Sequence, residues 1–143
     1  MAPTTEPEVL TKSISELADV QPKLPVRFEY MHRKMRHYGM VSEVNSEIRL
    51  CLVIEIATVP YTSENPAARE SLLQLLHSQL QLETGRFFMN SKQKLMYQTD
   101  GTMDGAVTGA TIVATATQLT IKARPYIVAA LEFATLPKPK LLN

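Results

Sequence analysis

The sequence predicts an α+β domain in which helices pack against an antiparallel β-sheet. Apolar and polar residues alternate through 47–56, which is the period of a half-buried strand. Two apolar runs within 86–99 flank a short polar connection, as the strands of a β-hairpin do. From 112 to 134, apolar residues recur every three or four positions, which is the period of a helix. The expected order of elements is α-β-β-(β)-α-β-β-α.

The chain's length suits one domain of this kind. It has 143 residues, of which 45% are hydrophobic and 20% are charged, so it can bury a single core. We expect an N-terminal arm at 1–24, one domain at 25–136 and a C-terminal tail at 137–143. The arm is either a short amphipathic helix docked on the body or on another chain, or a segment without fixed structure. Its apolar residues at helical spacing are Val9, Leu10, Ile14, Leu17 and Val20.

Charge and cysteine content limit the partners and the compartment. The chain has 15 basic and 14 acidic residues and a net charge of +1, which argues against nucleic acid or an anionic membrane as the principal partner. No segment approaches the roughly 18 to 20 consecutive apolar residues of a transmembrane helix, and the N-terminus lacks the pattern of a secretory signal. Cys51 is the only cysteine, so no internal disulfide can form. The cytoplasm is the expected location.

The first element of the body is expected to be a helix over 25–39. Pro25 can occupy its first turn and Gly39 can end it. An apolar stripe recurs at intervals of three, four and three residues; it consists of Phe28, Met31, Met35 and Tyr38. The charges of this segment indicate either a solvated outer face or a site for a phosphate or an acid. They are Arg27, Arg33, Lys34 and Arg36 against Glu29.

Two strands and a second helix are expected next. A short strand at 41–44 leads through a tight turn at Asn45-Ser46 into the alternating strand. Asn65 and Pro66 then form a suitable cap and first position for a helix. The buried stripe of that helix is expected to be Ala68, Leu72, Leu75, Leu76 and Leu80.

The hairpin is expected to end at Asp100-Gly101 and to lead into a long helix at 104–134. The β-branched residues of this last segment favour a strand, but the helical spacing of its apolar residues outweighs that propensity. Pro125 should kink or interrupt the helix. The spaced apolar residues are Ile112, Ala116, Leu119, Ala123, Ile127, Ala130 and Ala134.

Residue types that carry chemistry do not assemble into a recognisable motif. His32 and His37 are five apart, so they would not share a face of a helix, and no carboxylate cluster joins them or His77 to form a metal site. Cys51 lies between leucines in a strand, where a thiol usually serves as a small packing group. Asp100 and Asp104 have no identifiable partner base, and no G-x-S-x-G motif occurs. The sequence argues against an enzyme and predicts neither a metal nor a cofactor.

The hairpin region resembles that of YbjN-like proteins, a group that shares the type III secretion chaperone-like fold. The resemblance lies in "LQLETGRFFMNSKQKLMYQTDGTMDG" and extends over roughly 26–131. It implies a small cytosolic, often dimeric protein that holds other polypeptides and performs no bond chemistry. That family's layout has three strands before the middle helix, whereas the patterns above place two. The matching positions are Leu82, Gly85, Arg86, Phe87, Phe88, Leu95 and Tyr97.

Two kinds of binding site follow as hypotheses. The first is a protein-binding module, chaperone-like or adaptor, in which apolar residues contact a partner polypeptide or a second copy of the chain in a homodimer. Packing under the N-terminal arm is the competing interpretation of the face that carries Phe88. The candidate contacts are Phe88, Met96, Tyr97, Met31 and Met35. The second hypothesis is a sensor of a small anionic ligand that uses Arg27, Arg33 and Arg36.

Overall fold

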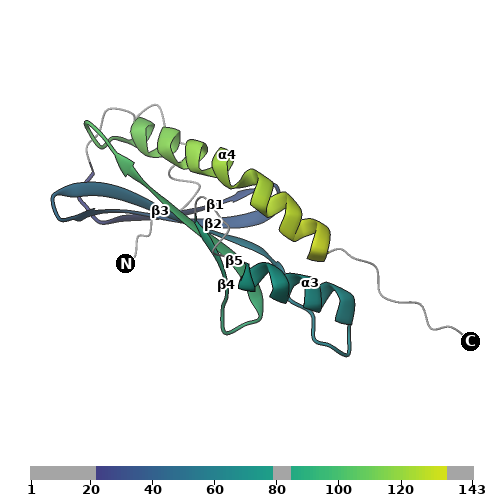
Figure 1. The fold of residues 1–143 in the computed structure, drawn as a ribbon. Coiled ribbons are helices and arrows are strands. Elements are labelled where there is room, and N and C mark those ends of the chain that lie inside the picture. Colours follow the sequence, from purple (N-terminus) through teal and green to yellow (C-terminus); the bar gives the residue numbers. More distant parts are fainter. Residues whose placement is uncertain (1–21, 79–84, 135–143) are drawn as a thin grey trace, which may run out of the picture.

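The computed structural model describes residues 22–78 and 85–134 as a five-stranded antiparallel sheet with two helices on one face (Figure 1). This arrangement confirms the α+β class. The predicted arm and tail lie, apart from 22–24, outside the described residues. The strands follow the order β1-β2-β3-β5-β4 across the sheet. In chain order the elements are β1 (Val26–His32), β2 (Met35–Val44), β3 (Glu47–Thr58), α3 (Pro66–His77), β4 (Arg86–Met89), β5 (Lys94–Met103) and α4 (Gly109–Ala134).

The central strand β3 forms as its alternation predicts. One set of its side chains faces the helices and is buried, and the other set is half-buried or exposed on the outer face of the sheet. Asn45 and Ser46 have φ values of 53° and 66°, which makes the β2–β3 connection the predicted two-residue turn. The buried residues of the strand are Leu50, Leu52, Ile54 and Ile56.

The helix expected at 25–39 is wrong, because this segment is a β-hairpin. β1 and β2 pair over seven positions, from Val26↔Val41 to His32↔Met35. Arg33 and Lys34 form the two-residue turn with φ values of 53° and 65°. The four residues whose 3-4-3 spacing suggested a helix lie on both strands of the hairpin. Phe28 and Met31 belong to β1, and Met35 and Tyr38 belong to β2. The segment supplies a third strand before the middle helix, so the described elements follow the order β-β-β-α-β-β-α.

Gly39 has a packing role in β2 and does not end a helix. It pairs with Phe28 across the hairpin, and a Cβ added at this position would collide with the Phe28 ring. The ring therefore lies flat over the glycine on the inner face of the sheet, where Phe28 is 4% exposed.

The helix α3 begins as its capping residues predict. The Asn65 side chain accepts a hydrogen bond from the Ala68 amide at 3.1 Å, and Pro66 occupies the first turn. Ala68 and Leu72 are buried, while Leu75 and Leu76 are partly buried against the core. The fifth predicted residue of the stripe, Leu80, lies outside the described residues.

The hairpin of β4 and β5 and the helix α4 confirm their predicted types with shifted boundaries. β5 continues through Asp100-Gly101 to Met103, because Gly101 pairs with Leu50 and leaves room for Leu119 of α4. α4 runs without interruption through Pro125, contrary to one of the two expected outcomes. Its buried stripe is the predicted one, with Ala134 half-buried at the end.

The described helices do not cover the whole inner face of the sheet. The part formed by β1 and β2 lies to one side of α4. α4 packs on β3 and β5, and α3 packs on α4 and β4. Figure 1 shows both helices on the same side of the sheet. The inner face of β1 and β2 therefore forms the floor of a groove along one side of α4.

The close pairing of Gly39 with Phe28 gives a test of this hairpin. Gly39→Ala should destabilise the fold by about 1 to 3 kcal/mol, because the added methyl group must displace a buried ring. Urea unfolding measures the change. Ser42→Ala lies on the outer face of the same strand and should cost no more than about 0.5 kcal/mol. Equal effects of the two substitutions would contradict the packing described here.

Candidate functional site

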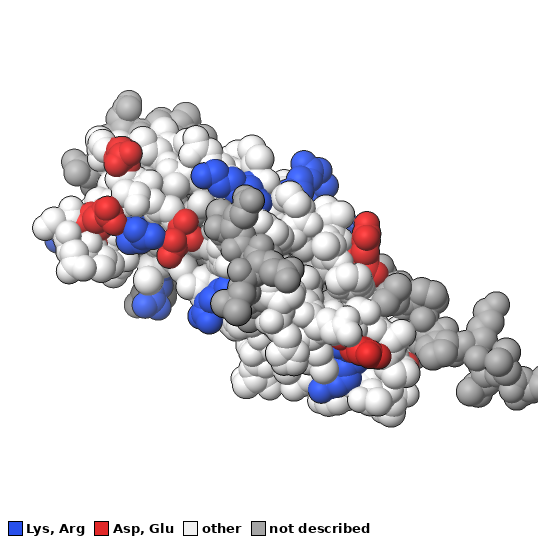
Figure 2. Space-filling model, in the orientation of Figure 1, with Lys and Arg blue, Asp and Glu red and all other residues white. Residues whose placement is uncertain are grey.

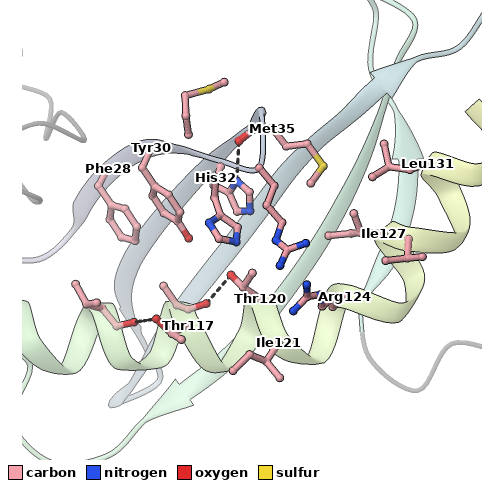
Figure 3. A pocket seen from close by; sticks show the side chains of 16 residues that line it. Phe28, Tyr30, His32, Met35, Thr117, Thr120, Ile121, Arg124, Ile127 and Leu131 are labelled. Carbon is pink, nitrogen blue, oxygen red and sulfur yellow. Dashed lines mark hydrogen bonds between the residues drawn. The ribbon is translucent and has the colours of Figure 1, made fainter. Parts of the chain in front are cut away.

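A groove with a volume of about 670 Å³ lies between the β1–β2 hairpin and α4 (Figure 3). This volume is within the range of ligand-binding clefts. The strand wall consists of Phe28, Tyr30, Met31, His32, Arg33, Met35 and His37. The helix wall consists of Val113, Ala116, Thr117, Thr120, Ile121, Arg124, Ile127, Val128 and Leu131.

A row of stacked rings forms the floor of the groove. Phe28 and Tyr30 stack with their ring centroids 6.1 Å apart, and Tyr30 stacks on His37 at 4.9 Å. Burial raises the pKa of Tyr30, and a hydrogen bond with Thr120 of α4 lowers it in part. The floor is thus flat, aromatic and uncharged, which suits an apolar occupant.

His37 has a buried ring nitrogen without a hydrogen-bond partner. Its side chain is fully buried, and Nδ1 lies 3.0 Å from the Met35 carbonyl oxygen. Since a carbonyl oxygen only accepts, Nδ1 carries the proton and the neutral ring leaves Nε2 as an acceptor. Nε2 is buried and meets no donor among the described residues.

Burial lowers the pKa of His37, and the positive charge that His32 can carry lowers it further. The His32 ring stands edge-on to it at 5.7 Å. The hydrogen bond to Met35 raises this pKa, by less than burial lowers it but by more than the charge on His32 does. The imidazole is therefore neutral at pH 7.

The rim of the groove is apolar and exposed. Met31, Ile121 and Val128 are 57%, 63% and 45% exposed. They are three of the five large hydrophobic side chains that are exposed among the described residues. Such a concentration of exposed apolar surface at one groove is typical of a binding site.

The charge that lines the groove is positive. Arg33 comes from the turn of the hairpin and Arg124 from α4, and Figure 3 shows the Arg124 guanidinium directed toward the groove. No Asp or Glu of the described residues lines it. Elsewhere, basic and acidic side chains are interspersed on the face that Figure 2 shows. The groove therefore favours an occupant with acidic edges.

The titratable groups of the groove are phenol, imidazole and guanidinium groups. Its titratable lining residues are a tyrosine, two histidines and two arginines, and no carboxylate or thiol among the described residues is there to act with them. Within 22–78 and 85–134, no three His, Cys, Asp or Glu side chains gather as a metal site requires. Cys51 lies on the outer face of β3, where burial raises the pKa of its thiol.

The structure divides the five predicted contact residues among three places. Tyr97 is fully buried between Phe87 and Tyr126, so the prediction that it contacts a partner is wrong. Phe88 is half-buried on the outer face of the sheet, beside Met96, which is 6% exposed.

The two remaining predicted contacts, Met31 and Met35, do line the groove, one at its rim and the other buried in its wall. They do so from different strands, and the helical stripe that was expected to join them does not exist.

The three arginines predicted to hold an anionic ligand do not converge. Arg33 lines the groove. Arg36 forms an ion pair with Glu29 at 3.1 Å on the outer face, where Arg27 is also exposed. The predicted three-arginine site is therefore wrong, because the hairpin separates residues that a helix would have brought together.

Sequence reasoning missed Tyr30, His37 and Arg124. One signal was available for the helix wall: Ile121 and Val128 are seven residues apart and lie outside the buried stripe of α4. Seven residues are close to two helical turns, so these two apolar residues share a face that the core does not use.

No protein-family model, curated protein or solved structure matches the chain. None of the helices in the described ranges is long and apolar enough to cross a membrane. The resemblance to YbjN-like proteins stays a prediction.

The buried histidine gives the groove a pH signature. Folding lowers the pKa of His37, so the folded protein is destabilised when the pH falls below about 6.5, the pKa of the histidine in the unfolded chain. The loss of stability grows until the pH reaches the pKa of His37 in the folded protein. The unfolded chain takes up a proton in this window and the folded chain does not. The free energy of unfolding should then fall by up to about 1.4 kcal/mol per pH unit.

Urea unfolding at pH 7.5, 6.5 and 5.5 measures this slope. His37→Gln should flatten it. His77→Gln, at the exposed end of α3 and away from the groove, is the matched control and should leave it as it is. An unchanged slope in His37→Gln would contradict the burial of a neutral imidazole.

Proposed function

We propose that the protein is a non-enzymatic protein-binding module, chaperone-like or adaptor, whose groove holds an amphipathic helix of a partner polypeptide. The observation that carries this proposal is the groove itself. It combines a buried aromatic floor with an exposed apolar rim. A helix that lays one apolar stripe into such a groove would cover both.

The dimensions of the groove suit a helix. Its helix wall extends from Val113 to Leu131, which corresponds to about 27 Å at 1.5 Å per residue. A partner helix of four or five turns has a similar length. Its apolar residues would recur every three or four positions and would contact Phe28, Met35 and Ile121.

The charges suit a helix with acidic edges. Arg33 and Arg124 stand on opposite walls, so carboxylates on both edges of a bound helix would each meet a guanidinium. Each such exposed pair contributes only about 0.2 to 1 kcal/mol. The apolar stripe therefore supplies most of the affinity, and the arginines select among partners.

The resemblance to YbjN-like proteins favours the same class of function. It implies a cytosolic and often dimeric protein that holds polypeptides, and we include the cytoplasm and a homodimer in the proposal on that ground alone.

A sensor of a small anionic ligand is the second candidate. Arg33 and Arg124 line the same groove, so an anion with an apolar tail could use both arginines and the aromatic floor. Of the three arginines predicted from the sequence, only Arg33 contributes to this version of the site.

Binding of two designed peptides tests the proposal. Both carry the same apolar stripe of an amphipathic helix, and their edge positions hold Glu in one and Lys in the other. Fluorescence anisotropy should show that the acidic peptide binds about tenfold more tightly at low salt. The difference should shrink as salt is added. Reversing both charges with Arg33→Glu and Arg124→Glu should invert the preference.

A matched pair of substitutions on α4 places the binding site. Thr117→Trp fills the groove and should abolish binding, whereas Gln118→Trp, the exposed neighbour outside the groove, should not. Equal binding by both variants, or no binding of either peptide, would contradict the proposal. If fatty acids or phosphorylated metabolites raise the melting temperature and no peptide binds, the sensor is the better account.

A further inference from the structure

The described chain begins at the end of the groove where β1 begins. Pro22 is the first described residue, and Leu24 and Val26 pack against the core just before Phe28, the first residue that lines the groove. The 21 residues that precede Pro22 are therefore tethered to the mouth of the groove. A segment held so close by a short link has a high effective concentration there.

The preceding segment has the pattern of a helix with one apolar face. At 100° per residue, its five spaced apolar residues fall within an arc of about 140°. Glu8 and Asp19 fall on the opposite side, and Glu16 falls next to the edge of the arc. The apolar residues of the arc are Val9, Leu10, Ile14, Leu17 and Val20.

The charge of this segment complements that of the groove. Residues 1–21 contain four acidic side chains and one lysine, a charge of −3, so the rest of the chain carries +4. Two of the basic residues of the body, Arg33 and Arg124, line the groove, which has no acidic lining residue among those described. The N-terminal segment is therefore acidic, and the groove next to which it ends is basic.

The length of the segment fits as well. As a helix, 8–20 would be about 20 Å long, which is shorter than the roughly 27 Å from Val113 to Leu131 along α4. If Val20 lies near Phe28, the helix would run along the groove toward Leu131. Ile14 would then lie near Ile121, halfway along the wall.

We propose that residues 8–20 bind as a helix in the groove of their own chain and compete there with the partner helix. This inference rests on the proposed function. The segment would cover the exposed side chains of Met31, Ile121 and Val128. A partner must then displace it, so its apolar arc, with Glu16 at the edge, sets the threshold for binding.

Disulfide cross-linking in the full chain tests the position of the segment. With Cys51→Ser as the background, Ile14→Cys and Ile121→Cys should form a disulfide within one chain under mild oxidation. Ser15→Cys with Ile121→Cys is the matched control, because residue 15 points away from the groove if the helix is docked. The first pair should react at least about tenfold faster than the control pair, since a docked helix holds only Ile14 near α4.

Each outcome of the cross-linking decides the proposal. A faster disulfide within one chain supports it. Equal rates for the two pairs would mean that the segment samples the groove without docking, and a disulfide mainly between two chains would mean that a second copy fills it. Either result would overturn the proposal.

A second variant separates this inference from the function on which it rests. Leu17→Glu places a charge in the apolar arc and should release the segment. The affinity of the full chain for the acidic peptide should then rise about tenfold if nine-tenths of the molecules are docked. Asp19→Asn, on the side of the helix opposite the arc, is the control and should leave the affinity nearly unchanged.

The outcomes distinguish the two proposals. If the peptide binds equally well to the wild type and to Leu17→Glu, the intramolecular helix is overturned and the binding function stands. If it binds to neither, both fail.

Discussion

The width of the sheet relative to the width of α4 is the constraint on which the rest of the structure depends. Five strands about 4.8 Å apart make a sheet roughly 19 Å across, whereas a helix with its side chains is about 10 to 12 Å wide. α4 packs on β3 and β5, and the shorter α3 packs on α4 and β4. The described helices therefore do not cover the inner face of the β1–β2 hairpin, which lies to one side of α4.

The residues of that hairpin are consistent with a face that receives another element. Phe28 lies flat over Gly39, and Tyr30 and His37 continue the row of rings. Of these rings, only Tyr30 keeps part of its surface exposed, because Phe28 is 4% and His37 is 0% exposed. The gain from an occupant comes from the exposed rim side chains Met31, Ile121 and Val128, since full burial of one large apolar side chain contributes about 1.5 to 3 kcal/mol. A polypeptide helix that covers several of them gains enough to offset the cost of its own ordering.

The sequence predicted the fold class and the elements whose local signals agree, but it failed where these signals conflict. β3, the cap of α3 and the stripe of α4 were recognisable because one period or one capping pair stood alone. The β1–β2 hairpin was missed because its turn is Arg33-Lys34, residues that seldom adopt positive φ. Its apolar residues also happen to fit a helical spacing. The groove could not be predicted in turn, because its floor and the rim residue Met31 belong to that hairpin, and the rest of its rim belongs to α4.

Nuclear Overhauser effects from the methyl groups of Ile121 and Val128 in the full chain test the central claim most directly. The account predicts contacts from these methyl groups to the side chains of a helix in the groove. That helix would be the chain's own 8–20 segment in the free protein and the added acidic peptide after it is displaced. Methyl groups that contact only their neighbours in α4 and the hairpin, with the peptide absent and with it in excess, would contradict the account.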